Sequence, residues 1–204
     1  MNYKITADST CDLSPELLEQ YGLGLTPLYV QLGEKTYRDG VDIFPDDIYA
    51  HVANGGDLAT TAAVNLADYV RLFSDLSRKY DFVIHICISS DFSCCYQNAS
   101  LAAAEYPNVY IVDSRNLSTG HGLVVLEAER CAREGMEPQE IVSYLQVLTE
   151  QVDAVDEDLD SLENDFYGEC DCCDDDEDEE YYDITCPSCG DEFSVDEDTL
   201  LEGG

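Results

Sequence analysis

The stretch DFVIHICISSDFSCCYQNASLAAAEYPNVYIVDS, residues 81–114, alternates strand and helix signals and decides the fold class. Residues 82–88 form an almost unbroken apolar run, which is typical of a strand that is buried on both faces. The Ala-rich segment that follows favours a helix, and residues 108–114 return to an apolar, β-branched pattern. A strand, a helix and a second strand in this order predict parallel strands joined by a helical crossover.

The flanking segments extend the same alternation. Residues 3–9 and 25–32 are predicted strands, and residues 66–80 carry apolar side chains at helical spacing. A last amphipathic helix is predicted to start near Pro138, because proline is favoured at the first helical position. We therefore predict an α/β domain over residues 1–152, with a mostly parallel sheet sandwiched by helices.

The composition changes beyond this domain. All nine Lys and Arg residues lie between Lys4 and Arg133, whereas about half of the 45 Asp and Glu residues follow Gln151. An acidic segment repels itself and has little apolar surface to bury, so residues 153–183 are predicted to be a disordered linker. Residues 184–204 recover some apolar character around a pair of cysteines. The expected C-terminal tail is therefore acidic, largely disordered and cysteine-containing.

The charge and the apolar pattern exclude several classes of partner. The net charge of −36 argues against nucleic acid and anionic membranes, which need clustered Lys and Arg. We find no signal-peptide pattern and no apolar run long enough to span a bilayer, so we expect no membrane insertion and a cytoplasmic location. In that reducing compartment the ten cysteines are expected to be free thiols or metal thiolates.

Small polar residues gather where predicted strands end. They occur in residues 7–12, 59–65, 88–97 and 112–122. Ligands of open parallel sheets bind at the carboxyl ends of strands, so these four segments are expected to converge on one site. Hydroxyl groups at a helix N-terminus favour an anion there. The alternative is that the serines of the third segment only cap the helix that follows.

Catalysis is not expected. A serine or cysteine nucleophile needs a neighbouring base, and the chain offers only His51, His85 and His121. His85 lies inside an apolar strand, where a satisfied core imidazole is the simpler interpretation, and His121 lies in a glycine-flanked turn. Cys94 and Cys95 have no base nearby in the sequence, although a helix N-terminus could lower a thiol pKa. We therefore expect a binding protein rather than an enzyme.

Four segments of the chain stand out together, and they are ITADSTCDLSPELLEQYGL (5–23), TTAAVN (60–65), ISSDFSCCYQNAS (88–100) and VYIVDSRNLSTGHG (109–122). In this order and with this spacing they resemble the DegV family of bacterial fatty-acid-binding proteins. The resemblance covers residues 1–152 and implies an N-terminal α/β domain, followed by a second domain of about equal size. An acyl chain would lie between the two domains, with its carboxylate bound by hydroxyl groups. Some family members deliver the fatty acid to a separate kinase.

The resemblance also implies the ligand residues. Thr61 matches the carboxylate-binding threonine of the family, and Ser93 matches the last serine of its SS-x-x-S turn. Ser89 and Ser90 are the first two serines of the same turn. Ala62 stands where many members have serine, which removes one donor. The resemblance therefore implies a fatty-acid carboxylate site made by Thr61, Ser89, Ser90 and Ser93.

The sequence after Ala154 departs from the family pattern. The second domain is not recognisable there, and with it the other tunnel wall and the basic residue that the family supplies. An acyl chain gains about 0.8 kcal/mol per methylene only where water is excluded. We therefore expect lipid binding to need a second copy of the chain, as a homodimer, and a truncated or fused product without lipid binding is an alternative.

The tail carries a separate metal signal. Cys186-Pro-Ser-Cys189-Gly has the spacing of a zinc knuckle, which supplies two of the four ligands of a zinc ribbon. Cys170 and Cys173 are the candidates for the other two. The alternative function is therefore a zinc-binding interaction protein that acts through its acidic tail.

Overall fold

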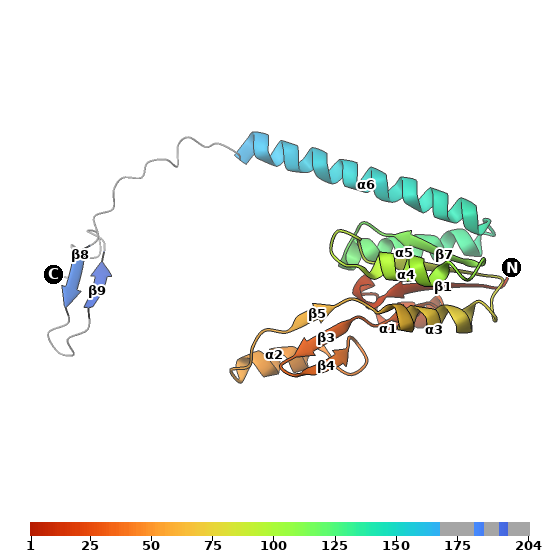
Figure 1. The fold of residues 1–204 in the computed structure, drawn as a ribbon. Helices are drawn as coiled ribbons and strands as arrows, with labels where there is room; N and C mark the ends of the chain where they lie inside the picture. The colour runs from red at the N-terminus through yellow and green to blue at the C-terminus, as the bar shows by residue number, and fades with distance from the viewer. Residues whose placement is uncertain (168–181, 186–191, 196–204) are drawn as a thin grey trace. The chain divides into compact units, whose positions relative to one another are not determined.

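The computed structural model describes residues 1–167, 182–185 and 192–195, and their side chains at residues 1–152 and Leu159 (Figure 1). No helix within these ranges is both long enough and apolar enough to cross a membrane.

A four-stranded parallel sheet forms the centre of the first part of the chain. Every residue of its strand β6 is buried, as the continuous apolar run predicts. The predicted α/β fold with parallel strands is confirmed. In sheet order the strands are β2 (Gly24–Thr26), β1 (Tyr3–Asp8), β6 (Phe82–Cys87) and β7 (Val109–Asp113).

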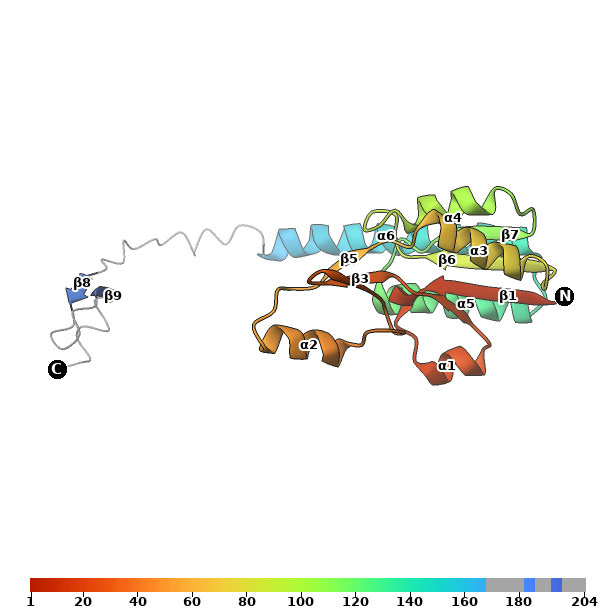
Figure 2. The ribbon, with the colours of Figure 1, turned by 60° about the horizontal axis from the view of Figure 1, so that its bottom comes forward.

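Helices cover both faces of this sheet. Figure 2 shows α3 (Leu66–Leu76) and α4 (Cys95–Ala103) on one face and α5 (Ser118–Arg133) on the other. Alternate residues of β6 face the two layers, because side chains of a strand point to opposite sides. Ile84 packs in the cluster with α5, and Val83 packs in the cluster with α3 and α4.

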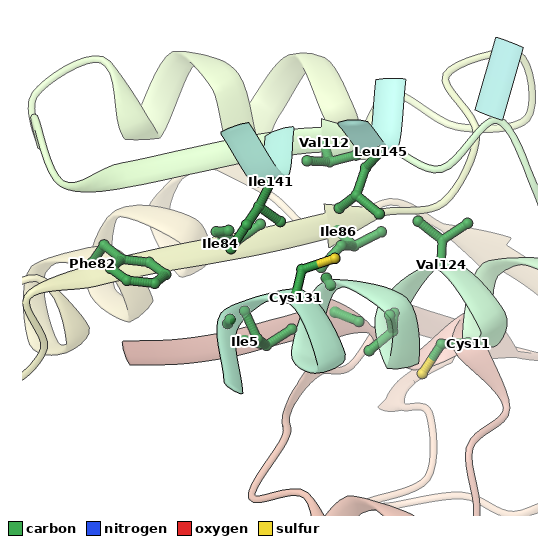
Figure 3. Close-up of a cluster of buried hydrophobic side chains, with 14 residues drawn as sticks. Ile5, Cys11, Phe82, Ile84, Ile86, Val112, Val124, Cys131, Ile141 and Leu145 are labelled. Carbon is green, nitrogen blue, oxygen red and sulfur yellow. The ribbon is translucent and has the colours of Figure 1, made fainter. Parts of the chain in front are cut away.

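The cluster on the α5 side also includes the start of α6 (Pro138–Tyr167). In Figure 3, Ile141 and Leu145 of α6 lie beside Ile84, Ile86 and Val112 of the sheet. Both α6 residues are fully buried. The predicted amphipathic helix at Pro138 is therefore a core element.

A three-stranded antiparallel sheet adjoins the parallel one. It has the order β4 (Lys35–Arg38), β3 (Tyr29–Leu32) and β5 (Thr60–Ala62). The short helices α1 (Pro15–Gln20) and α2 (Pro45–Ala53) and the 3-10 turn η1 (Ser9–Cys11) complete the connections.

The single strand predicted over residues 25–32 was wrong, because the segment divides between the two sheets. Pro27 has no N–H group to donate to a strand neighbour. The N–H of Leu28 donates to Oγ of Ser9 at 3.1 Å instead of joining a strand. The chain thus leaves the parallel sheet after Thr26 and enters the antiparallel sheet at Tyr29.

The segment predicted to be a disordered linker, residues 153–183, begins inside α6, which continues to Tyr167, and its residues 168–181 lie outside the described residues. The prediction considered only how little surface the segment could bury. A helix satisfies its own backbone, and extending one that is already fixed at Ile141 and Leu145 costs little per residue. No Gly or Pro interrupts residues 139–167.

The chain divides into two compact units, Met1–Asp156 and Glu157–Gly204. In the second unit, β8 (Tyr182–Thr185) pairs with β9 (Glu192–Val195) in antiparallel register. The predicted zinc ligands lie outside the described residues, and they are Cys170, Cys173, Cys186 and Cys189.

Candidate ligand-binding site

A cavity of about 250 Å³ lies where β5 meets the loop between β6 and α4. Two of the predicted ligand residues line it, Thr61 from β5 and Ser93 from the loop before α4. Its lining residues are Leu28, Thr61, Ala62, Ala63, Ile88, Phe92, Ser93 and Cys94.

The antiparallel sheet positions the first of these residues. Thr61 is the middle residue of β5 and pairs with Val30 of β3. A β-branched residue suits this extended backbone. After β5 the chain runs to Val64, whose carbonyl accepts a 2.9 Å hydrogen bond from Nδ2 of Asn98 on α4. This bond holds the threonine segment against the helix that carries the other side of the cavity.

A tight turn positions the second residue at the start of α4. The carbonyl of Ser89 accepts hydrogen bonds from the N–H groups of Phe92 and Ser93, at 3.1 and 3.2 Å. Oγ of Ser93 then accepts the N–H of Cys95 at 3.3 Å and lies 3.2 Å from its Sγ. The Ser93 hydroxyl therefore serves the first turn of α4, as the capping alternative predicts, and also lines the cavity.

Ser89 and Ser90 are not among the residues that line the cavity. Ser89 is buried, and its Oγ accepts the N–H of Asp91 at 3.2 Å. The N–H of Ser90 donates to Oδ1 of Asp113 at 3.2 Å. The structure thus brings Thr61 and Ser93 together and uses Ser89 and Ser90 to shape the turn beside them.

The cavity is neutral and partly apolar. None of its described lining residues is charged, so its polarity comes from hydroxyl groups, a thiol and the N-terminus of α4. Leu28, Ile88 and Phe92 supply the apolar wall, and the Phe92 side chain is exposed at 68%. A few polar groups in an apolar cavity suit a ligand with one polar head and an apolar body.

A family model described as an uncharacterised protein of the DegV family matches residues 2–163.

The chain belongs to the DegV family.

A DegV domain-containing protein of Caldanaerobacter subterraneus subsp. tengcongensis is 36% identical over 141 residues, which cover 68% of this chain and 50% of that relative. Two solved structures agree with this result. A fatty-acid-binding DegV family protein from Thermus thermophilus matches with a TM-score of 0.68 and 33% identity, over 74% of this chain and 54% of that one. A stearic-acid-binding protein from Eubacterium ventriosum matches with a TM-score of 0.63 and 31% identity, over 71% of this chain and 52% of that one.

This DegV chain spans about half the length of the curated relatives that it matches. The family model covers the α/β domain and α6 as far as residue 163, and it includes the cavity with Thr61 and Ser93.

A buried polar network lies under the cavity, and no motif of the sequence predicts it. Asp8 at the end of β1 accepts the Tyr69 hydroxyl at 2.7 Å and the N–H of Ile88 at 3.0 Å. His85 lies 3.3 Å from the same carboxylate, and its other ring nitrogen lies 2.9 Å from Oγ1 of Thr6. This network fixes Ile88, one of the lining residues. The strand-end segment 7–12 was the only sequence signal for Asp8.

Hydrogen bonding keeps Asp8 ionised although it is fully buried. Burial alone raises the pKa of the carboxyl group, but the hydrogen bonds from His85, Tyr69 and the backbone hold the pKa below its ordinary value. Burial raises the pKa of Tyr69, and the Asp8 charge raises it further. Tyr69 is therefore a protonated donor throughout the physiological range.

Asp8, His85 and Cys87 lie close enough to one another to suggest a metal centre. The imidazole argues against it, because both of its nitrogens already have partners in Thr6 and Asp8. Burial also raises the pKa of the Cys87 thiol well above its ordinary value, so the thiol is protonated in this core. These residues fit a structural core better than a metal site.

The residues considered for catalysis lie in packed surroundings. Nδ1 of His121 is 3.4 Å from Oγ1 of Thr10, and its Nε2 is 3.2 Å from the carbonyl oxygen of Ile86. Burial lowers the pKa of His121, so the ring is neutral. Burial, followed by the charge of Asp8, raises the pKa of the Cys95 thiol. A protonated thiol is a poor nucleophile.

Proposed function

We propose that this DegV-family chain binds a fatty acid, with the carboxylate held by the hydroxyl groups of Thr61 and Ser93. The observation that carries the proposal is their meeting in one cavity, from two elements that the Asn98–Val64 hydrogen bond holds together. Ser89 and Ser90 contribute by fixing the turn that presents Ser93. Relatives described as binding fatty acids share the fold of this part.

The surroundings favour a carboxylate at this place. No charged residue among the described lining residues repels it, and the N-terminus of α4 offers a favourable dipole next to Ser93. The apolar wall of Leu28, Ile88 and Phe92 would receive the first methylenes of the chain. Each methylene that is removed from water contributes about 0.8 kcal/mol.

A long acyl chain needs more cover than one open cavity provides. We propose that a second copy of the chain supplies this cover. The bound lipid would then be held between two α/β domains. This arrangement gives a homodimer that carries fatty acid.

The proposed role is transport rather than catalysis. The thiol of Cys95 is buried and protonated, and His121 is neutral and enclosed, so neither provides an activated nucleophile or a free base. We propose a cytoplasmic carrier that presents its fatty acid to a separate kinase. The free thiols among the described residues suit a reducing compartment.

A second candidate function rests on the tail. Cys186-Pro-Ser-Cys189-Gly has the spacing of a zinc knuckle, and in the sequence it lies between the paired strands β8 and β9. We propose that these two thiolates, completed by Cys170 and Cys173, bind zinc.

Native mass spectrometry of the full chain, purified without chelator, tests both candidates by weighing bound lipid and bound metal. Thr61→Val with Ser93→Ala is expected to lower affinity for a fluorescent fatty acid by tenfold or more, because two hydrogen bonds to a charged head are lost. The matched control is Thr60→Val with Ser100→Ala, which changes the same residue types outside the cavity lining. Equal fatty-acid affinity of the two double variants would show that Thr61 and Ser93 do not bind the carboxylate.

Separate variants test zinc binding. Cys186→Ser with Cys189→Ser is expected to abolish a stoichiometric zinc adduct and to leave the lipid adduct intact. A full chain without bound zinc, or with zinc that survives these substitutions, would dispose of the metal candidate.

A further inference from the structure

Helix α6 carries an apolar repeat along its whole length. From Ile141 onward, apolar residues recur with alternating steps of four and three positions. This spacing has a period of 3.5 residues, which is the signature of a helix that packs against another helix along a seam. The positions of the repeat are Ile141, Leu145, Leu148, Val152, Val155, Leu159, Leu162 and Phe166.

The α/β domain uses only the first part of this repeat. Ile141 and Leu145 are fully buried, and Leu148 packs against the same core cluster. Further along α6, the Val152 side chain is 38% exposed and Leu159 is 52% exposed. The described side chains thus change from buried to exposed along one repeat. We call the part from Val152 to Phe166 the distal stripe.

The residues beside the distal stripe determine what could cover it. In the heptad register of the repeat, Asp156 and Glu163 take the position that follows one seam row. Asp158 and Asp165 take the position that precedes the other row. These are the flanking positions that select a partner by charge. No Lys or Arg follows Arg133 in the chain, so nothing in α6 offsets these acids.

A second α6 is a poor partner for this charge pattern. In either the parallel or the antiparallel orientation, a copy would bring acidic flanks against acidic flanks, which opposes pairing. A helix with the same apolar spacing and with Lys or Arg at its flanking positions would instead place apolar residues against the distal stripe and basic residues against its acidic flanks. The distal stripe shares no residue with the lipid cavity.

We propose that the distal stripe of α6 is a docking surface for an amphipathic helix of another protein, with apolar residues at heptad spacing and basic flanks.

Two designed peptides of three heptads test the proposal against the full chain. The first has Leu at the seam positions and Lys at the flanking positions, and the second is a scramble of the same composition without an apolar face. In about 0.15 M salt, fluorescence anisotropy is expected to show at least tenfold tighter binding of the first peptide. Equal binding of both peptides would mean attraction by charge alone and would overturn the proposal.

Substitutions in α6 locate the surface. Leu159→Gln places a neutral polar residue in the seam and is expected to weaken binding of the Lys-flanked peptide by tenfold or more. Ser161→Gln adds the same side chain outside the repeat and is expected to change binding less than twofold. Unchanged binding of the Leu159→Gln chain would overturn the proposal. Thermal unfolding of the α/β domain is the folding control, because Leu159 lies outside both core clusters.

Two further outcomes would identify a different occupant of the distal stripe. Equally tight binding of a Glu-flanked version of the first peptide would contradict charge selection. Sedimentation of the chain alone as a dimer that Leu159→Gln dissociates would identify the occupant as a second copy. Either result would overturn the proposal of a basic partner helix.

Discussion

The hydroxyl of Tyr69 donates a 2.7 Å hydrogen bond to Oδ1 of Asp8, across 61 positions of sequence. The bond joins α3 to the end of β1 inside the core, where both residues are fully buried. The other carboxylate oxygen of Asp8 accepts the N–H of Ile88 at 3.0 Å, at the floor of the candidate cavity. One buried carboxylate therefore connects the packing of α3 to the shape of the site.

Replacing Tyr69 by Phe is expected to lower the free energy of unfolding by about 1.5–3 kcal/mol, because the ionised Asp8 loses a donor where water cannot replace it. Urea denaturation measures the change. Tyr49→Phe is the matched control, since the Tyr49 side chain is 70% exposed on α2 and its loss of a hydroxyl should have little effect. Similar values for the two variants would show that the Tyr69–Asp8 bond adds nothing to stability.

The buried His121 predicts a pH dependence. Its folded pKa lies below the ordinary value of about 6.5, so the unfolded chain takes up a proton first as the pH falls. The stability that depends on neutral His121 is therefore complete above about pH 6.5 and decreases as the pH falls toward the folded pKa. His121→Gln removes this proton uptake. The destabilisation by His121→Gln is expected to be smaller at pH 5.5 than at pH 7.5, by up to about 1 kcal/mol.

Urea denaturation of both proteins at the two pH values checks this expectation. A substitution that costs the same free energy at pH 5.5 and pH 7.5 would show that His121 does not change its protonation between the folded and unfolded chain in this range.

The sequence was sufficient for the parallel sheet, because residues 82–88 can be buried only between two layers and the helices around them are amphipathic. The same reasoning failed at Pro27, where one missing N–H and a long-range bond from Leu28 to Ser9 end the strand. It also did not predict how far α6 extends, because the continuation of the helix to Tyr167 depends on its packed start and not on local composition.

The candidate site was predictable only in part. Thr61 and Ser93 come from two of the four segments that were expected to converge, and both line the cavity, whereas no residue of 7–12 or 112–122 does. The sequence does not distinguish them from Ser89 and Ser90, since adjacent serines of one turn point in different directions only once the turn is formed. The network around Asp8 was missed because its partners are far apart in sequence.

The bond from Asn98 to the carbonyl of Val64 provides a test of how the site is assembled. Asn98→Ala is expected to destabilise the domain by about 1 kcal/mol and to weaken fatty-acid binding several-fold, although both proposed ligand residues remain. Asn108→Ala is the matched control, because its Nδ2 also donates to main-chain carbonyls, those of Ser77 and Tyr80. Titration with a fluorescent fatty acid measures the affinity of both variants. An equal loss of affinity in Asn98→Ala and Asn108→Ala would show that general destabilisation, and not the Asn98–Val64 bond, weakens binding.

The close approach of η1 to α5 gives a last prediction, because it depends on a glycine. A Cβ added to Gly122 would lie 2.6 Å from the carbonyl oxygen of Cys11, which is backbone and cannot turn aside. Gly122→Ala is therefore expected to destabilise the domain by about 1–3 kcal/mol, although alanine is the better helix former. Because η1 also holds Leu28 through Ser9, fatty-acid affinity should fall as well.

Gly120→Ala is the control for that substitution, since its Cβ would meet the side chain of Asn116 rather than backbone. Side chains rotate at a smaller cost than backbone shifts, so Gly120→Ala should lose less stability than Gly122→Ala in urea denaturation. A larger loss of stability in Gly120→Ala than in Gly122→Ala would mean that η1 can move away from α5 freely. In that case the bond between Ser9 and Leu28 could not fix the cavity wall, and the lipid affinity of Gly122→Ala should remain that of the unchanged chain.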